Sequence, residues 1–255
     1  MADDSRTDPP TRLRRLLPGP AEDVDVAEAY AVPEPTAPHV RANMVSSADG
    51  SATVHGRVGE LTGSADQTVL HTLRAQCDVL LVGAGTVRAE GYGPIRLTDE
   101  EQARREQEGR AGTPRLAVLS RSLELDPDAP VFTRATARPI LLTPTGADPR
   151  RRALFEPVAD VVEAESPAEA IAGLHERGLR HVLSEGGPHT LAQLLAADLV
   201  DELCLAVSPT AVSGEGLRIT AGPPLAAPAP LRLTQVLEHE GYLFLRYLTG
   251  AGERR

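Results

Sequence analysis

The sequence predicts an α/β fold with a mostly parallel central sheet, flanked by helices and followed by a C-terminal antiparallel hairpin. Continuous apolar runs, typical of strands buried on both faces, occur at 78–83 and 201–208. Segments of helical period begin with helix-start signals near residues 64 and 166. Two strand-like segments, 231–237 and 242–248, flank Glu240-Gly241. Alternating strands and helices that end in a hairpin favour one α/β sheet with an antiparallel edge.

The chain has 255 residues, of which 41% are hydrophobic, and this is enough for one large core. We expect one domain over residues 38–255, preceded by an N-terminal extension over residues 1–37. The extension is rich in Pro, Arg, Asp and Glu, which disfavours a continuous packed element. Within it, Leu13, Leu16 and Leu17 are expected to dock as a short helix if they pack at all.

The formal net charge of −10 argues against a nucleic-acid or anionic-membrane surface as the main partner. Cys77 and Cys204 lie in apolar runs, so we expect buried free thiols and no metal site. No apolar stretch approaches the roughly 20 residues of a membrane helix, and the first residues do not resemble a signal peptide. We therefore expect a cytoplasmic protein with a small-molecule substrate.

The first core strand is expected at residues 39–47, before a turn at Gly50. A helix follows from Ser64, which is expected to cap it while Gln67 reaches back. Asp66 lies on the same side of this helix as its apolar stripe. Further along the chain, residues 98–110 are almost wholly polar and are expected to be a solvated helix or a mobile insertion.

The stretch 182–195 is expected to be a buried strand that enters two glycines and then a helix opened by Pro188. Gly186 and Gly187 would let a ligand approach the backbone, and free amides at a helix start attract anions. A plain strand-to-helix turn is the structural alternative.

Three strand ends carry chemistry suited to anions: Gly83 to Thr86, Ser120 to Ser122, and Gly186 to Thr190. In an open α/β sheet, ligands bind outside the carboxyl ends of the strands, so all three can face one crevice. Together they suit a dinucleotide, with Ser120-Arg121-Ser122 at an extra phosphate, the feature that separates NADP from NAD. A solvated surface arginine is the alternative interpretation of Arg121.

The stretches Asn43 to Gly50, Leu73 to Val87, and Ser184 to Leu191 with Leu199 to Leu203 jointly resemble one family. It is the reductase domain of the bifunctional riboflavin-pathway deaminase/reductase, the RibD C-terminal family, which has a dihydrofolate reductase-like fold. The resemblance covers roughly residues 38–248. The zinc signature of the deaminase half cannot be made from two isolated cysteines, so we expect a stand-alone reductase.

The resemblance implies NADPH as the cofactor and a homodimer, and the edge near strand 201–208 also favours pairing. It implies a glutamate, Glu185, near the reacting centre, and substrate groups from Asn43, Ser47, Asp49 and Arg96. The strand ends and the resemblance together predict these cofactor-binding residues: Gly83, Ala84, Gly85, Thr86, Ser120, Arg121, Ser122, Gly186, Gly187, Pro188 and Thr190.

Two departures from the family bear on the substrate. Ser51 stands where riboflavin-pathway reductases usually carry a lysine that could hold a sugar phosphate, and Glu90-Gly91-Tyr92 replaces an acidic-Asp-Pro stretch. Asp66 stands where we expect a neutral residue, whereas dihydrofolate reductases place a substrate-binding carboxylate near the start of this helix. An aspartate at a helix start is also stabilised by the helix dipole without any ligand.

The sequence therefore predicts an NADPH-dependent reductase that delivers hydride to a C=N bond, with Asp66 and Glu185 as catalytic candidates. The first choice of substrate is a ribosylaminopyrimidine phosphate, of the 5-amino-6-(5-phosphoribosylamino)uracil type, reduced to its ribityl form. The alternatives are dihydrofolate reduction, which Asp66 and Ser51 favour, and a non-catalytic NADP-binding protein.

Overall fold

The structure, a computed structural model, describes residues 12–32 and 34–254. The first part of the predicted extension, residues 1–11, lies outside them. The strands are β1 Leu13–Leu17, β2 Ala21–Val24, β3 His39–Ser47, β4 Val79–Gly83, β5 Arg115–Leu119, β6 Ile140–Thr143, β7 Asp160–Glu163, β8 His181–Gly186, β9 Glu202–Ser208, β10 Leu231–His239 and β11 Tyr242–Thr249. The helices are α1 Val26–Ala29, the 3-10 turn η1 Gly59–Leu61, α2 Ser64–Gln76, α3 Ala84–Glu90, α4 Asp99–Gln107, α5 Pro130–Thr133, α6 Pro149–Phe155, α7 Pro167–Glu176, α8 Pro188–Ala196 and α9 Gly250–Glu253.

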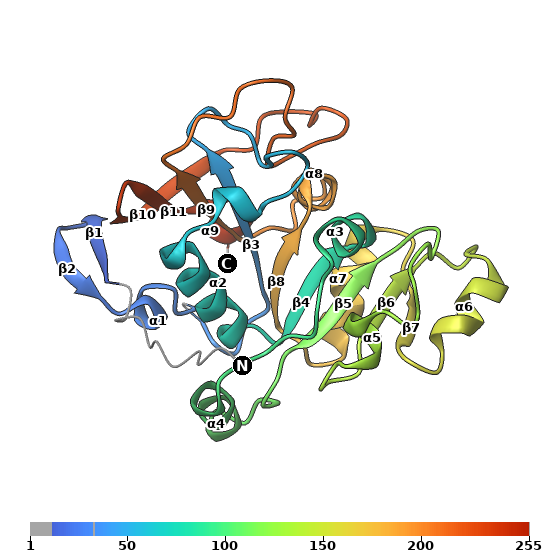
Figure 1. Cartoon of the computed structure of the whole chain (residues 1–255). Helices are drawn as coiled ribbons and strands as arrows, with labels where there is room; N and C mark the ends of the chain where they lie inside the picture. Colours follow the sequence, from blue (N-terminus) through green and yellow to red (C-terminus); the bar gives the residue numbers. More distant parts are fainter. Residues whose placement is uncertain (1–11, 33, 255) are drawn as a thin grey trace, which may run out of the picture.

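All of these strands belong to one twisted sheet, which runs across Figure 1 in the order β2-β1-β10-β11-β9-β3-β8-β4-β5-β6-β7. The run from β9 to β7 is parallel throughout. The strands on the other side of β9 pair antiparallel, with β10 and β11 as the C-terminal hairpin. The predicted α/β architecture is thereby confirmed.

Helices cover both faces of the parallel part of the sheet, because its strands are apolar on both sides. In Figure 1, α2 and α3 lie on the near side, where Leu73 and Val87 join one buried cluster. On the far side, α7 and α8 contribute Leu174 and Leu191 to a second cluster. The carboxyl ends of β3, β4, β5 and β8 meet at one edge of the sheet, since these strands are parallel.

The segment after residue 11 corrects one prediction. Residues 13–17 form the strand β1, not a short helix, and β1 pairs antiparallel with β10. The backbone of β10 would otherwise offer unpaired N–H and C=O groups at a sheet edge, and β1 satisfies them. Leu13 is fully buried in the core, whereas Leu16 and Leu17 are 43% and 36% exposed. The helix prediction was wrong because pairing with a distant strand outweighs local leucine content.

The start of α2 corrects a second prediction. Its N-cap is Gly63, whose carbonyl accepts the amide hydrogen of Gln67, and no side chain caps the helix. Ser64 is already helical, so the expected capping box is wrong and Asp66 is the third helical residue. At α7 the expected cap is present, because the Ser166 hydroxyl accepts the Glu169 amide hydrogen at 3.2 Å.

The polar segment 98–110 contains the helix α4, opened by a capping box between Thr98 and Glu101. Its Arg105 is 1% exposed and donates hydrogen bonds to the carbonyls of Ala75 and Cys77 at 2.8 and 2.6 Å. These carbonyls belong to the C-terminal end of α2, which lacks intrahelical donors. Of the two expected forms, the segment is therefore a helix, and it holds the end of α2.

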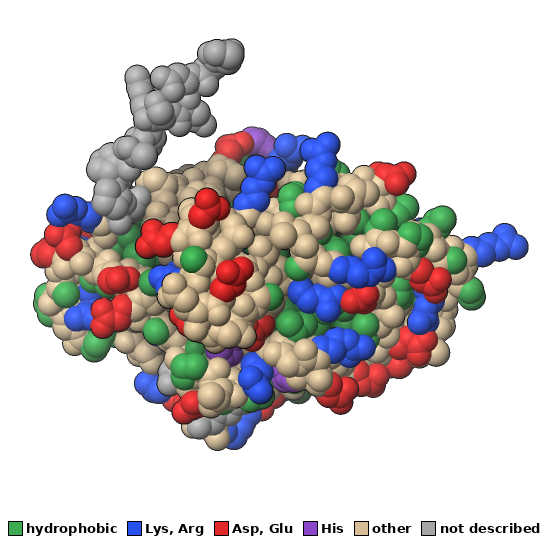
Figure 2. Space-filling view, turned by 90° about the horizontal axis from the view of Figure 1, so that it is seen from below, with side chains coloured by type: hydrophobic (Ala, Val, Ile, Leu, Met, Phe, Trp, Pro, Cys, Tyr) green, Lys and Arg blue, Asp and Glu red, His purple; other side chains and the backbone are tan. Residues whose placement is uncertain are grey.

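Arginine and acidic side chains are interspersed on the face seen from below in Figure 2. Among the described residues, no helix is long and apolar enough to cross a membrane. Over the same residues, no group of three or more His, Cys, Asp or Glu side chains could hold a metal ion.

Candidate active site

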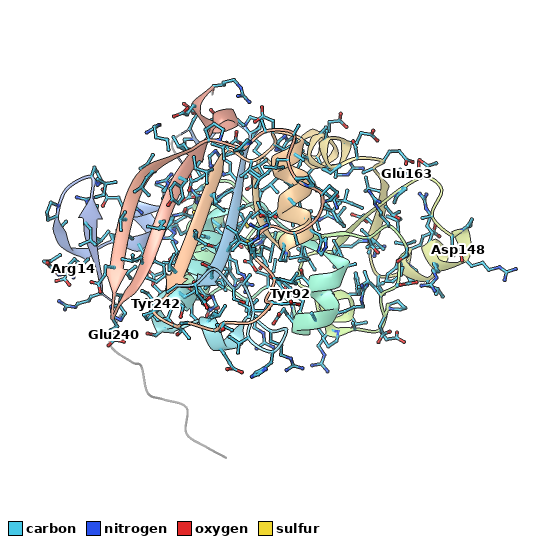
Figure 3. All side chains as sticks on the ribbon, turned by 90° about the horizontal axis from the view of Figure 1, so that it is seen from above. Arg14, Tyr92, Asp148, Glu163, Glu240 and Tyr242 are labelled. Carbon is cyan, nitrogen blue, oxygen red and sulfur yellow. The ribbon has the colours of Figure 1, made fainter. Side chains whose placement is uncertain are left out.

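A cavity of about 470 Å³ opens at the carboxyl ends of β3, β4 and β8. Figure 3 places Tyr92, one of its lining residues, in the middle of the molecule, between Tyr242 at one end and Asp148 at the other. Its lining includes Asn43, Thr53, Gly56, Val58, Asp66, Arg74, Gly83, Gly85, Thr86, Glu90, Tyr92, Glu185, Gly186, Gly187, Pro188, His189, Thr190 and Leu217.

A second cavity of about 260 Å³ adjoins the first, because Gly83, Gly85 and Thr190 line both. It lies over the ends of β4 and β5. Its other lining residues include Ala84, Arg88, Ser120, Arg121, Ser122 and Glu165. The two cavities together form one elongated site along the edge where the parallel strands end, as expected for ligands of an open α/β sheet.

The junction between the cavities is built from glycines. A Cβ atom at Gly83 would lie 2.7 Å from the Thr190 Oγ1, and one at Gly187 would lie 2.4 Å from the Thr86 Oγ1. Gly187 also has φ +77°, which disfavours any other residue. Gly85 differs, because a Cβ there would have no atom within 4 Å. The first two glycines let β4, β8 and the start of α8 pack closely, and Gly85 faces open space.

Glu185 is held by two side chains at the floor of the first cavity. Arg74 Nε donates to Glu185 Oε1 at 2.7 Å, and Arg74 Nη2 donates to Oε2 at 2.6 Å. The Tyr92 hydroxyl also donates to Oε2, and burial, then the charge of Glu185, raise the pKa of Tyr92. The Glu185 side chain is 7% exposed. One guanidinium thus holds both carboxylate oxygens of Glu185 in a forked, charge-assisted pair.

Asp66 is the second carboxyl group of the cavity, and it is 5% exposed. Burial, and after it the negative charge of Glu185, raise the pKa of Asp66 to about 6. The two predicted catalytic candidates therefore face the same cavity in different electrostatic settings. Glu185 has a guanidinium partner, whereas no cation lowers the pKa of Asp66.

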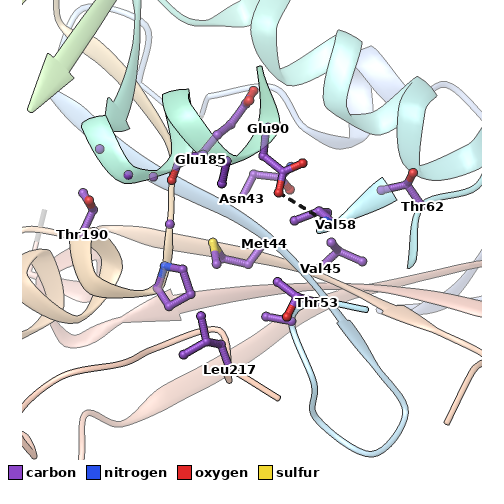
Figure 4. A pocket seen from close by; sticks show the side chains of 18 of the residues that line it. Asn43, Met44, Val45, Thr53, Val58, Thr62, Glu90, Glu185, Thr190 and Leu217 are labelled. Carbon is purple, nitrogen blue, oxygen red and sulfur yellow. Dashed lines mark hydrogen bonds between the residues drawn. The ribbon is translucent and has the colours of Figure 1, made fainter. Parts of the chain in front are cut away.

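Figure 4 shows Asn43, Glu90 and Glu185 along one side of the cavity, with Thr53 and Leu217 across from them. Asn43 projects from the middle of β3. Glu90 lies at the end of α3 and accepts the amide hydrogen of Val58 at 3.3 Å. This bond ties α3 to the loop that forms the outer wall.

Three predicted substrate residues do not line this cavity. The Ser47 hydroxyl donates to Asp49, and Asp49 accepts amide hydrogens from Val212 and Ser213. These bonds, the Ser47 bond first, lower the pKa of Asp49 to about 2. Ser47 and Asp49 therefore hold a loop, and Arg96 is exposed outside the lining. Local turn chemistry explains the Ser-x-Asp pattern without a substrate.

All the predicted cofactor-binding residues line one of the two cavities. In the loop after β5, the Ser120 hydroxyl accepts the amide hydrogen of Leu123 at 3.0 Å, while Arg121 and Ser122 are exposed. Arg88 also lines the second cavity, and its Nη1 donates to the Glu124 carbonyl at 2.8 Å. The sequence reasoning missed Arg88.

It also missed Arg74 and Tyr92, the two partners of Glu185. The position of Arg74, two turns after Asp66 on one helix, was the available signal. For Tyr92 the signal in the sequence is the departure from the family pattern at Glu90-Gly91-Tyr92.

Comparisons with known proteins agree on one family. The family model described as the RibD C-terminal domain matches residues 38–241. A relative from Archaeoglobus fulgidus is 24% identical over 69% of this chain and 83% of its own length. One from Methanothermobacter thermautotrophicus is 26% identical over 71% and 82%. Both are named 2,5-diamino-6-ribosylamino-4(3H)-pyrimidinone 5′-phosphate reductase.

Among solved structures, a pyrimidine reductase-like protein from Corynebacterium diphtheriae superimposes with a TM-score of 0.81. It is 29% identical, and the match covers 89% of this chain and 99% of that one.

Proposed function

The chain belongs to the RibD C-terminal domain family, and from this we propose that it is an NADPH-dependent reductase of a C=N bond in a ribosylaminopyrimidine phosphate. The observation that carries the proposal is the pair Asp66 and Glu185 in a cavity that continues directly into the glycine-lined junction. The names of the relatives support the substrate class.

The residues present fit a dinucleotide. Gly83 and Gly187 bring the hydroxyls of Thr190 and Thr86 to the junction, and the amides at the start of α8 suit a pyrophosphate. Ser120, Arg121 and Ser122, with Arg88, would hold the 2′-phosphate in the second cavity. Gly85 leaves open space beside both cavities. When bound, NADPH supplies the hydride.

The protein's own groups would orient the substrate and manage one proton. Reduction of C=N adds hydride to carbon and a proton to nitrogen, so NADPH and H⁺ give NADP⁺ and an amine. Asp66, with its pKa raised to about 6, is suited to carry that proton near neutral pH. Glu185, fixed by Arg74, would accept hydrogen bonds from ring N–H groups and stabilise positive charge on the reacting nitrogen.

Dihydrofolate reduction is the second candidate, and Asp66 is the observation that favours it. Asp66 is a buried carboxyl group that lines the cavity. A carboxylate in such a place can accept two hydrogen bonds from the 2-aminopyrimidine edge of a substrate and so favour protonation of the adjacent C=N bond. The 2,5-diamino-pyrimidinone named for the relatives shares this edge with the pterin, whereas the uracil type carries an oxygen at C2 in place of the amino group.

The test is NADPH oxidation by the purified protein, followed at 340 nm, with 2,5-diamino-6-ribosylamino-4(3H)-pyrimidinone 5′-phosphate and with dihydrofolate in parallel. Faster oxidation with the pyrimidine supports the first proposal, and faster oxidation with dihydrofolate supports the second. NADPH binding without acceleration by either compound would favour the non-catalytic alternative.

We also propose a homodimer in the cytoplasm. Leu231 and Leu233 on β10 are 43% and 38% exposed, and Leu17, in register with Val236 of β10, is 36% exposed. These exposed leucines lie on the antiparallel strands β1 and β10, which a second copy would cover in a dimer. Sedimentation of the wild type and of Leu233→Arg tests this: dimer for the first, monomer for the second. A wild-type monomer at micromolar concentration contradicts it.

A further inference from the structure

The connection between β9 and β10, residues 209–230, forms part of the wall of the first cavity. All of these residues are described, and they contain no helix or strand. Connections of more than about 15 residues without secondary structure are uncommon, and in a compact domain they are usually functional. In Figure 1 this one is the orange loop at the top of the molecule, beside the carboxyl end of β3. We call its residues 210–221 the strap.

The strap joins two walls of the cavity. At one wall, the Ala52 amide donates a hydrogen bond to the Leu217 carbonyl at 2.6 Å, just after the turn that follows β3. At the other wall, the Ala221 amide donates to the Pro188 carbonyl at 3.1 Å, at the start of α8. Ala52, Pro188 and Leu217 all line the cavity. The strap is thus anchored both beside β3 and at the glycine-lined junction.

Leu217 brings an apolar side chain from the strap to the cavity. Figure 4 shows it across the cavity from Glu185. Leu217 is 46% exposed, so a ring bound against it would remove apolar surface from water, which is favourable. A ring held between Leu217 and the opposite wall is also limited in its orientation, as hydride transfer requires. The position of the strap therefore matters for substrate binding.

The Asp49 carboxylate fixes the first part of the strap. It accepts the amide hydrogens of Val212 and Ser213 at 3.1 and 2.7 Å, and the Ser47 hydroxyl also donates to it. These bonds, the Ser47 bond first, lower the pKa of Asp49 to about 2, so the carboxylate is ionised at neutral pH. Ser213 has φ +64°, which is unfavourable for a residue with a side chain. Bonds to an ionised acceptor offset that cost and hold this conformation.

We propose that Asp49 is a positioning residue: its carboxylate holds the strap in place, and the strap holds Leu217 against the bound substrate. The inference rests on the proposed reductase function and gives Asp49 a substrate role that acts through the strap. Asp49 lies outside the lining of the cavity, whereas Leu217 lies inside it. Without the Asp49 carboxylate the strap opens more often. Substrate must then close the strap on binding, which lowers its apparent affinity.

Limited proteolysis with trypsin measures the opening of the strap without any substrate. Arg218 is exposed within the strap, and trypsin cleaves after an arginine when its segment opens from the folded surface. Asp49→Asn keeps the shape of the side chain but removes its charge and one of its two acceptor oxygens. Cleavage after Arg218 should become roughly three- to tenfold faster, a modest factor because the bonds of Asp49 are exposed to solvent.

The matched control is Asp148→Asn. It changes an exposed carboxylate that also accepts a backbone amide hydrogen, that of Arg150 at 2.8 Å, at the far end of the molecule in Figure 3. This control should leave cleavage after Arg218 unchanged. An unchanged rate in Asp49→Asn overturns the proposal. So does equally faster cleavage after every arginine, which would mean general unfolding.

Calorimetry on the NADP⁺-loaded protein measures the consequence for substrate binding. Asp49→Asn should raise the Kd of 2,5-diamino-6-ribosylamino-4(3H)-pyrimidinone 5′-phosphate about threefold or more. In turnover it should raise KM for this compound and leave kcat within about twofold, because saturating substrate closes the strap. An unchanged Kd overturns the proposal.

Leu217→Ala separates a role through the strap from a direct contact of Asp49 with the substrate. The Leu217 carbonyl still accepts the Ala52 amide hydrogen in this variant, but the side chain that the strap positions is gone. Asp49→Asn should therefore have little effect on Kd when Leu217→Ala is already present. A full additional loss of affinity in the double variant would mean that Asp49 contacts the substrate itself, and it would overturn the role through the strap.

The proteolysis and binding measurements need no turnover, so they separate this inference from the proposed function. Faster cleavage after Arg218 and weaker binding in Asp49→Asn, without turnover of the compound by the wild type, would contradict the reductase function and support the role of Asp49. Wild-type turnover with unchanged cleavage and affinity in Asp49→Asn would contradict the role of Asp49 and leave the reductase function standing.

Discussion

Replacing Asp66 with asparagine should stabilise the protein at neutral pH while it impairs catalysis. Burial raises the pKa of Asp66 from 3.8 to about 6, and each unit corresponds to about 1.4 kcal/mol. The ionised carboxylate therefore destabilises the fold by up to about 3 kcal/mol above pH 6. The helix dipole at the start of α2 offsets roughly 0.3–1 kcal/mol of this destabilisation. We expect Asp66→Asn to gain about 1–3 kcal/mol in the free energy of unfolding at pH 7.5.

The sign follows from linkage. A carboxyl whose folded pKa is raised contributes its full stability when protonated, below the unfolded pKa, and loses it as pH rises from about 4 to about 6. The gain from Asp66→Asn should thus be about 2 kcal/mol larger at pH 7.5 than at pH 4.5. Urea unfolding of both proteins at both pH values measures this, and other titrating groups cancel in the difference.

The matched control is Asp99→Asn, which removes an exposed acid from the first turn of α4. Asp99→Asn should lower the free energy of unfolding by up to about 1 kcal/mol, opposite in sign to Asp66→Asn, because only the helix dipole acts on Asp99. If the substrate is folate-like, dihydrofolate turnover by Asp66→Asn should fall at neutral pH and recover partly in acid, where the substrate protonates from solvent. If Asp66→Asn is less stable than the wild type at pH 7.5, the reasoning from burial is refuted.

Three further outcomes are expected. Gly85→Val should weaken NADPH binding at least tenfold by calorimetry and leave unfolding within about 1 kcal/mol, since a Cβ there meets no atom; unchanged affinity would show that the open space is not used. Arg121→Ala should weaken NADPH roughly tenfold to a hundredfold and NADH little; equal losses for both cofactors would contradict a 2′-phosphate contact. Arg105→Ala should lower the free energy of unfolding in urea by about 3 kcal/mol, because it leaves buried carbonyls at the end of α2 without a donor. The exposed control Arg104→Ala should lower it by less than about 0.5 kcal/mol. Equal effects of the two substitutions would contradict the role of Arg105 in holding α2.

The sequence was most informative where one local pattern has one structural solution. The apolar runs of β4 and β9 are buried on both faces, as their composition indicates. The Gly-Gly-Pro stretch becomes the end of β8 and the start of α8, with φ +77° at Gly187. These strands and this strand-to-helix junction depend on residues that are neighbours in the chain, so they can be predicted from the sequence.

Predictions failed where a distant partner decides the outcome. The leucines around Leu13 form a strand because β10 offers an edge more than 200 residues away. The substrate roles of Ser47 and Asp49 stay predictions, but the bonds of the Asp49 carboxylate to the amides of Val212 and Ser213, far away in the chain, could not be predicted from the local sequence. Arg105, in the most polar segment of the chain, is fully buried because the carbonyls of α2 need donors. None of these partners is visible in the local sequence.

Arg74 and Tyr92 give the two carboxyl groups of the first cavity different surroundings. A lone Glu185 beside Asp66 would leave two nearby carboxyl groups competing for one proton. Arg74 and Tyr92 break that symmetry, since both bond Glu185 and neither bonds Asp66. Under the proposed function, Asp66 would exchange the proton near neutral pH, because burial, and after it the charge of Glu185, raise its pKa to about 6.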